Sequence, residues 1–94
     1  MANTAKTFKA TAAPTLVAAA AAVYTNSTDK TVIVRYVTEI SSHISMTGDA
    51  TATDAFVPAN CIEILNVNPG KIISAIRGAA ESDSVVWITE ITQV

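Results

Sequence analysis

His43 is the residue best suited to acid–base chemistry, because it is the single histidine in 94 residues and stands four residues after Glu39. Ser41 and Ser42 lie between the two, so a hydroxyl, an imidazole and a carboxylate fall close together, as a serine hydrolase requires in space. The segment nevertheless offers neither a nucleophile elbow nor a source of an oxyanion hole. We therefore predict that the protein is not an enzyme, and we assign no catalytic residue.

The thiol and the carboxylates offer little more chemistry. Cys61 is the only cysteine, which excludes a disulfide within one chain and a zinc site built from several cysteines. It stands at the start of an expected strand, so we predict a small buried hydrophobe in preference to a reactive thiol. Asp49, Asp54 and Glu63 could bind a hard cation, but their spacing matches no calcium loop. We interpret them as solvated carboxylates and expect neither a metal nor a cofactor.

Motifs for phosphate, nucleic acid and glycan are also weak. Asn68-Pro69-Gly70-Lys71 lacks the upstream glycine and the following hydroxyl residue of a phosphate loop, and predicts a type I or II turn. Charged residues make up 15% of the chain, six basic and eight acidic, which leaves little to build a surface that follows a phosphate backbone. Asn26-Ser27-Thr28 is a formal glycosylation acceptor that has meaning only in a secretory pathway.

The elements that carry these residues are predicted to be strands. Thr, Val and Ile account for 33 of the 94 residues and Leu for only two, which is typical of sheets and not of helix bundles. A chain of this length forms one domain. Polar clusters interrupt it about every ten residues, so strands are predicted near 31–40, 43–47, 52–57, 61–67, 71–77 and 84–93. The pattern indicates an all-β fold, a small antiparallel β-sandwich or barrel.

The faces of these strands differ in clarity. In 31–40, alternation places Val34 and Tyr36 on the core side, together with Val32, Thr38 and Ile40. In 61–67, 71–77 and 84–93, apolar residues lie on both sides, so both faces of a sheet need covering. Either a bulge shifts the register and some apolar side chains stand exposed, or an outer face packs against other copies or another protein. Trp87, the only tryptophan, is predicted to fill the core.

Residues 1–24 are expected to form an extended N-terminal arm, and 25–94 the sandwich domain. Lys6 and Lys9 before the apolar run 16–23 imitate a secretory signal, but that run is mostly alanine, and we expect the protein to be made without export. No stretch is long and apolar enough to span a membrane. A short helix over the alanines 18–22 is the alternative to an extended arm or edge strand, although capping residues are missing. We expect the arm to lie on a neighbouring molecule.

A series of turn and strand signals between about residues 23 and 92 resembles small virion proteins of tailed bacteriophages. These signals are shared with many β proteins, and the first 22 residues depart from the pattern. The series comprises Val23-Tyr24-Thr25-Asn26, the strand from Thr31 to Ile40, Val57-Pro58-Ala59-Asn60, Asn68-Pro69-Gly70-Lys71-Ile72-Ile73 and Val85-Val86-Trp87-Ile88.

The resemblance implies a structural virion protein, in the first place a capsid decoration or cement protein on the head surface, made in the host cytoplasm. The alternatives are a neck, tail or baseplate component and, third, a receptor-binding fibre module. Expected partners are the major capsid protein or another virion protein, and further copies of this chain, with a trimer as the first guess; neither nucleic acid nor membrane is expected. Deleting residues 2–22 should then leave a folded domain that no longer binds particles. The arm residues expected to bind the partner are Phe8, Leu16, Val17, Val23 and Tyr24.

Overall fold

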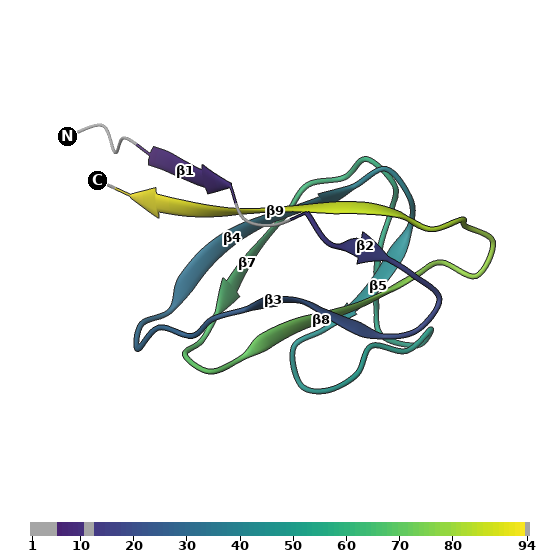
Figure 1. Ribbon diagram of the computed structural model, residues 1–94, viewed down its shortest axis with the longest axis horizontal. Helices are drawn as coiled ribbons and strands as arrows, with labels where there is room; N and C mark the ends of the chain where they lie inside the picture. The colour runs from purple at the N-terminus through teal and green to yellow at the C-terminus, as the bar shows by residue number, and fades with distance from the viewer. Residues whose placement is uncertain (1–5, 11–12, 94) are drawn as a thin grey trace.

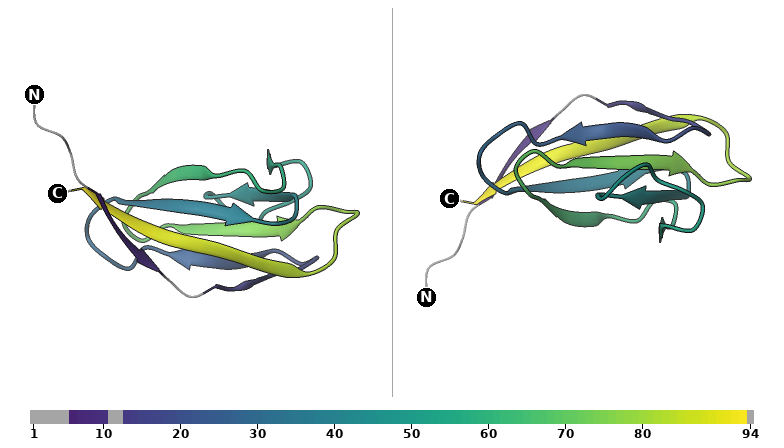
Figure 2. Two further views of the ribbon diagram at one scale, coloured as in Figure 1. Left: turned by 90° about the horizontal axis from the view of Figure 1, so that it is seen from above. Right: turned by 90° about the horizontal axis from the view of Figure 1, so that it is seen from below.

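The computed structural model describes residues 6–10 and 13–93, and within them the chain is all-β. Two antiparallel sheets pack face to face as a small sandwich, which confirms the predicted fold class (Figures 1 and 2). The strands are β1 Lys6–Ala10, β2 Thr15–Leu16, β3 Ala21–Thr25, β4 Val32–Thr38, β5 Ser42–Ser45, β6 Ala55–Val57, β7 Glu63–Val67, β8 Ile72–Arg77 and β9 Ser84–Gln93.

The long strand β9 organises the larger sheet. The five-stranded sheet has the order β1-β9-β4-β7, with β2 also paired to β9, and the four-stranded sheet has the order β3-β8-β5-β6. β1 pairs with residues 89–93 of β9 and β2 with residues 84–85, so both lie along the same edge of this strand, opposite β4. Figure 1 shows β1 beside the last part of β9, at the end of the molecule where the chain begins and ends.

The six strands predicted between residues 31 and 93 are all present. The range 84–93 matches β9, whereas the other strands are somewhat shorter than expected. The largest shift of a strand start is at 52–57, where β6 begins only at Ala55. Asp54 explains the delay: its backbone N–H donates to Thr51 O at 3.0 Å, and its Oδ2 accepts from the Thr51 N–H at 2.7 Å. This local turn competes with the strand.

The core lies between the sheets and follows the predicted face of β4. Val34, Tyr36 and Thr38 are fully buried, with Val32 and Ile40 packed against the core, which confirms the expected alternation. Tyr36 Oη and Ser42 Oγ lie 2.7 Å apart in the interior. This bond joins β4 of one sheet to β5 of the other and satisfies two buried hydroxyls that would otherwise destabilise the fold.

Residues 15–24 pair with strands of the sandwich, whereas we expected residues 1–24 to form an arm; residues 1–5 and 11–12 of that arm lie outside the described residues. The Val86 N–H donates to Pro14 O at 3.0 Å, and the Arg77 N–H donates to Val17 O at 2.9 Å. The segment thus leaves β9 in one sheet and reaches β8 in the other (Figure 1). Leu16 is fully buried at this crossing. The segment is held by its own domain because its apolar side chains close the side of the sandwich.

The alanine-rich part of this segment is extended and not helical, as the first of the two alternatives predicted. β3 begins at Ala21 and pairs with β8, and a bulge between Ala22 and Tyr24 accommodates Val23, which is buried in the core. Small side chains at 18–22 suit this path because two of them, Ala21 and Ala22, lie directly opposite Ala75 and Ser74 of β8.

The turns around Asn26 and Gly70 hold the two sheets together at one end. The Lys71 N–H donates to Asn68 O at 3.0 Å, and Gly70 has a φ of 75°, which identifies the predicted turn as type II. The Gly70 N–H donates to Asn26 O at 2.9 Å, and the Asn26 N–H donates to Lys71 O at 2.9 Å. The loop before β4 is therefore bound to the turn between β7 and β8.

Candidate functional site

The outer side of the five-stranded sheet carries the largest group of unpartnered apolar side chains in the described chain. Strand register places residues of different strands in rows across this side. One row contains Phe8, Ile91 and Ile33, and a second contains Trp87 and Val37. Between them, Ile64 lies opposite Arg35, and Ile62 precedes it by two residues. We call the following set the apolar outer face: Phe8, Ile33, Val37, Ile62, Ile64, Trp87 and Ile91.

Four members of the apolar outer face are largely exposed. The exposed fractions are 61% for Phe8, 54% for Ile62, 55% for Ile64 and 43% for Trp87. The prediction that Trp87 fills the core is therefore wrong. Its neighbours Val86 and Ile88 point inward and are buried, and because side chains alternate along β9, Trp87 must point outward. Single exposed apolar residues need no explanation, but a contiguous set across four strands indicates a contact surface.

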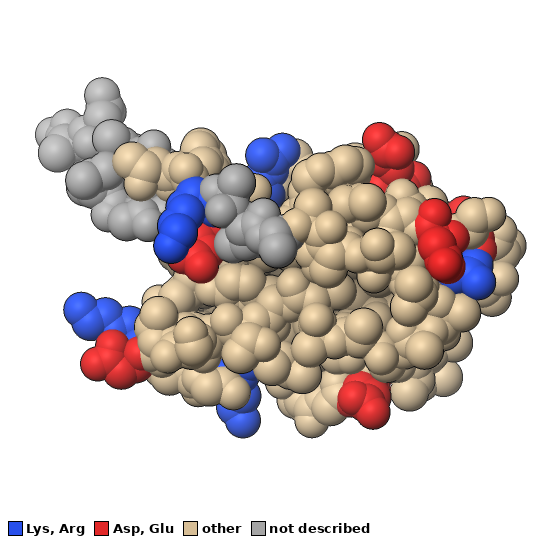
Figure 3. All heavy atoms as spheres, in the orientation of Figure 1, with Lys and Arg blue, Asp and Glu red and all other residues tan. Residues whose placement is uncertain are grey.

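Within the rows described above, charge is scarce. Arg35 is the one charged residue in the three rows described above, and it is half-buried between Thr89 and Ile64. Charged side chains are also scarce on another side of the molecule. Figure 3 shows them mainly around the margin of the view, with a broad uncharged area over the middle. The apolar outer face is thus suited to burial against a partner by area and not by ion pairing.

The five residues predicted to bind a partner do not lie on one surface. Leu16 and Val23 are buried in the molecule's own core, because they close the side of the sandwich. Val17 is half-buried, and its carbonyl is bonded to Arg77. Tyr24 packs against the core and donates its hydroxyl to Glu90 Oε2 at 3.2 Å. Phe8 alone presents a largely exposed side chain, and it belongs to the apolar outer face.

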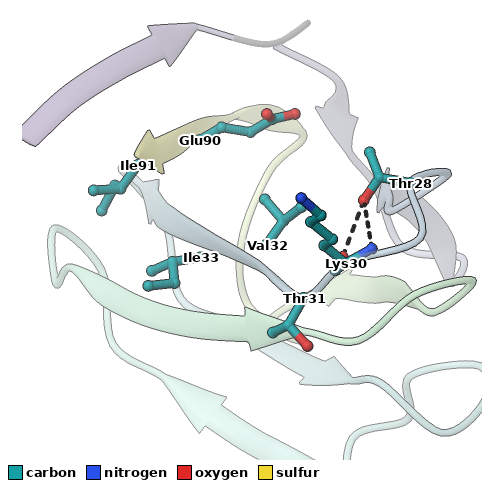
Figure 4. A pocket seen from close by; sticks show the side chains of 7 residues that line it. All are labelled: Thr28, Lys30, Thr31, Val32, Ile33, Glu90 and Ile91. Carbon is teal, nitrogen blue, oxygen red and sulfur yellow. Dashed lines mark hydrogen bonds between the residues drawn. The ribbon is translucent and has the colours of Figure 1, made fainter. Parts of the chain in front are cut away.

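A hollow of about 400 Å³ opens at the end of the sandwich beside the last part of β9 (Figure 4). Its walls combine aliphatic side chains with one ammonium and one carboxylate. The Glu90 carboxylate is engaged by Tyr24, and burial followed by the charge of Glu90 raises the pKa of Tyr24 to about 12. The hollow therefore offers contact area and little reactive chemistry. It is lined by Thr28, Lys30, Thr31, Val32, Ile33, Glu90 and Ile91.

The hydrolase-like group around His43 is not assembled. The Nδ1 atom of His43 lies 3.1 Å from Asp54 O, and the His43 ring contacts the ring of Phe56, with centroids 5.3 Å apart. Ser42 points into the core toward Tyr36, whereas Ser41 donates both its N–H and its hydroxyl to Glu81 Oε2. The serines and the histidine thus have separate partners. His43 also lines a smaller hollow of about 230 Å³.

Cys61 and the acidic residues lie apart from one another. Cys61 is exposed, so the prediction of a small buried hydrophobe is wrong; the residue precedes β7 and is not yet part of the paired strand. Asp49 is an exposed loop residue, Asp54 holds the turn before β6, and Glu63 lies in β7. Among the described residues, no three His, Cys, Asp or Glu side chains form a group that could hold a metal ion.

None of the described residues form a helix of the length and apolarity needed to cross a membrane. No protein-family model matches the chain, and the search of curated proteins gives no significant match.

Proposed function

We propose that this protein is a structural virion protein of a tailed phage, in the first place a capsid decoration or cement protein that binds the head shell through the apolar outer face. The phage setting comes from the resemblance of residues 23 to 92. The mode of action comes from one observation, the exposed apolar side chains that cross four strands of a sheet in rows whose one described charged residue is Arg35.

The energy available on this surface favours repeated contacts over a single strong one. Burying the exposed half of one large apolar side chain contributes about 1 kcal/mol, so Phe8, Ile62, Ile64 and Trp87 together supply about 4 kcal/mol. That is no more than the low end of the cost of associating two molecules, about 4 to 15 kcal/mol. Weak contacts become effective when they are multiplied, as in an oligomer placed on a regular shell. Further copies of this chain and a capsid protein are the partners that fit this reasoning.

The direct test is to count copies of the chain in purified particles by quantitative mass spectrometry. A decoration protein should be present on the order of hundreds of copies, whereas a neck, tail or baseplate ring holds about six or twelve. A ring-sized number would move the proposal to that second location, and absence of the chain from purified virions would overturn both. If the protein reinforces the shell, particles assembled without it should also release their DNA at a lower temperature than particles that contain it.

A pair of matched variants tests the surface itself. Trp87→Glu places a charge on the apolar outer face, and Phe56→Glu places the same charge at an aromatic residue of similar exposure, 56%, on the four-stranded sheet. Both positions are exposed enough for each variant to fold, which circular dichroism would verify. We expect Trp87→Glu to reduce binding to particles at least about tenfold, since a buried unpaired charge is costly, and Phe56→Glu to leave binding unchanged. Equal binding of both variants contradicts the proposed surface.

A further inference from the structure

β1, like β6 and β7, has one extensively contacting neighbour, but unlike them it has no described side chain that is buried. It pairs along its whole length with β9, from Lys6 opposite Gln93 to Ala10 opposite Thr89, and shares no extensive contact with any other element. Thr7, Phe8 and Lys9 are exposed. β1 is thus held by its contact with one strand.

The next strand shows the contrast. β2 is only two residues long, yet Leu16 is fully buried and belongs to the core cluster. Leu16 therefore anchors the chain to the sandwich directly after β1, independently of whether β1 is paired. Removing β1 from β9 uncovers no buried side chain among those described in β1, and it breaks the pairing along β9, which an identical strand from another copy would restore in full.

We propose that β1 is an exchangeable strand. Where many copies of this chain are close together, β1 leaves its own β9 and pairs with residues 89–93 of β9 in a second copy. The interface made in the exchange is the same as the one broken, so the balance is set by concentration. A short tether gives an internal strand an effective concentration on the order of millimolar, which dilute copies do not reach. Copies held side by side on a surface do reach it.

The geometry of the exchange limits how the copies sit. Residues 11–14 connect β1 to β2 and span at most about 14 Å when extended. The receiving β9 must therefore lie next to the donating copy. A reciprocal exchange closes a pair, and a successive exchange closes a ring or continues as a chain of copies. The inference concerns contacts between copies and stands on the pairing of β1, independently of the apolar outer face.

Cross-linking of two single-cysteine chains tests the exchange. Lys9 and Glu90 lie opposite each other in the register, on the side of the sheet away from the apolar outer face, so face-to-face contact of two molecules does not bring them together. In a Cys61→Ser background, which removes the exposed native thiol, chains with Lys9→Cys are mixed with chains carrying Glu90→Cys. The mixture is concentrated to the millimolar range and oxidised.

The expected result is a disulfide-linked heterodimer formed at least about tenfold more than in a control mixture, in which Thr53→Cys of the exposed loop replaces Lys9→Cys. A single chain carrying both Lys9→Cys and Glu90→Cys, oxidised when dilute, should close within itself and show that the pair can be bridged. This locked chain should then lose the oligomers that form by strand exchange, whereas association through the apolar outer face should remain. Heterodimer at the control level, with the internal bridge forming normally, overturns the exchange without touching the proposed function.

Discussion

The buried side chain of Asn26 bonds to three residues, two in its own loop and one in β7. Its Nδ2 donates to Lys30 O at 2.7 Å and to Val67 O at 2.8 Å, and its Oδ1 accepts from the N–H and the hydroxyl of Thr28 at 2.9 and 2.6 Å. Because the amide is fully buried, the formal glycosylation motif that it begins is closed to modification in the folded protein. The residue is structural.

Replacing this side chain should destabilise the fold. Asn26→Ala leaves the carbonyl of Val67 buried without its donor, and each such loss costs about 1 to 3 kcal/mol, so we expect a drop of about 2 to 4 kcal/mol in the free energy of unfolding. Urea denaturation measures it. Asn66→Ala, at an exposed position of β7, is the matched control and should change little. Equal midpoints for the two variants would contradict the role assigned to Asn26.

Tyr24 should make the folded protein less stable at alkaline pH. Burial, and then Glu90, raises its pKa from 10.0 to about 12, whereas an unfolded chain ionises near 10.0. The neutral phenol thus contributes stability that is complete below pH 10 and is lost as the pH rises toward 12. Urea midpoints measured on both sides of pH 10 should fall on the alkaline side, less so in Tyr24→Phe. An identical fall in that variant would rule out Tyr24 as the cause.

Among the elements, β2 and β3 should be indispensable and β1 dispensable. Deleting residues 2–10 removes only exposed side chains among those described, so we expect a folded sandwich of reduced stability. Deleting residues 2–22 also removes Leu16, whose loss as Leu16→Ala alone costs about 2 to 5 kcal/mol, and half of the pairing of β3. We expect that chain to be unfolded. Circular dichroism and thermal melts decide; a cooperative melt of the longer deletion would restore the idea of a separate arm.

The positions of the strands could be predicted from the sequence better than the burial of their faces or their pairing. The face of β4 was predictable because Val34 and Tyr36 alternate with Arg35, a residue that prefers water. In β9, apolar residues stand on both faces, and periodicity cannot tell a core from a surface that another molecule covers. The prediction that Trp87 fills the core was wrong for this reason. The same strand had nevertheless indicated that apolar side chains lie on a second face, and Trp87 lies on that face. The pairing of β3 with β8 is a contact between distant segments, which no local pattern encodes.

For the whole molecule, the balance of apolar and charged surface predicts how association responds to salt. The net charge is −2, and Arg35 is the one described charged residue in the rows of the apolar outer face. Screening therefore removes little attraction, and salts excluded from protein surfaces strengthen burial. We expect sedimentation to show self-association that persists or increases when sodium sulfate is added. Dissociation at high salt would instead indicate contacts held by charge, and the apolar outer face would lose its assigned role.

The pairing of Lys6 with Gln93 brings the first and last described residues of this chain next to each other. A short linker could therefore join Gln93 to Lys6, while new ends are opened at the exposed residues 51–53. Such a circular permutant would keep every strand in place and tie β1 permanently to its own β9. This variant should still bind through the apolar outer face but could no longer exchange β1 with a second copy.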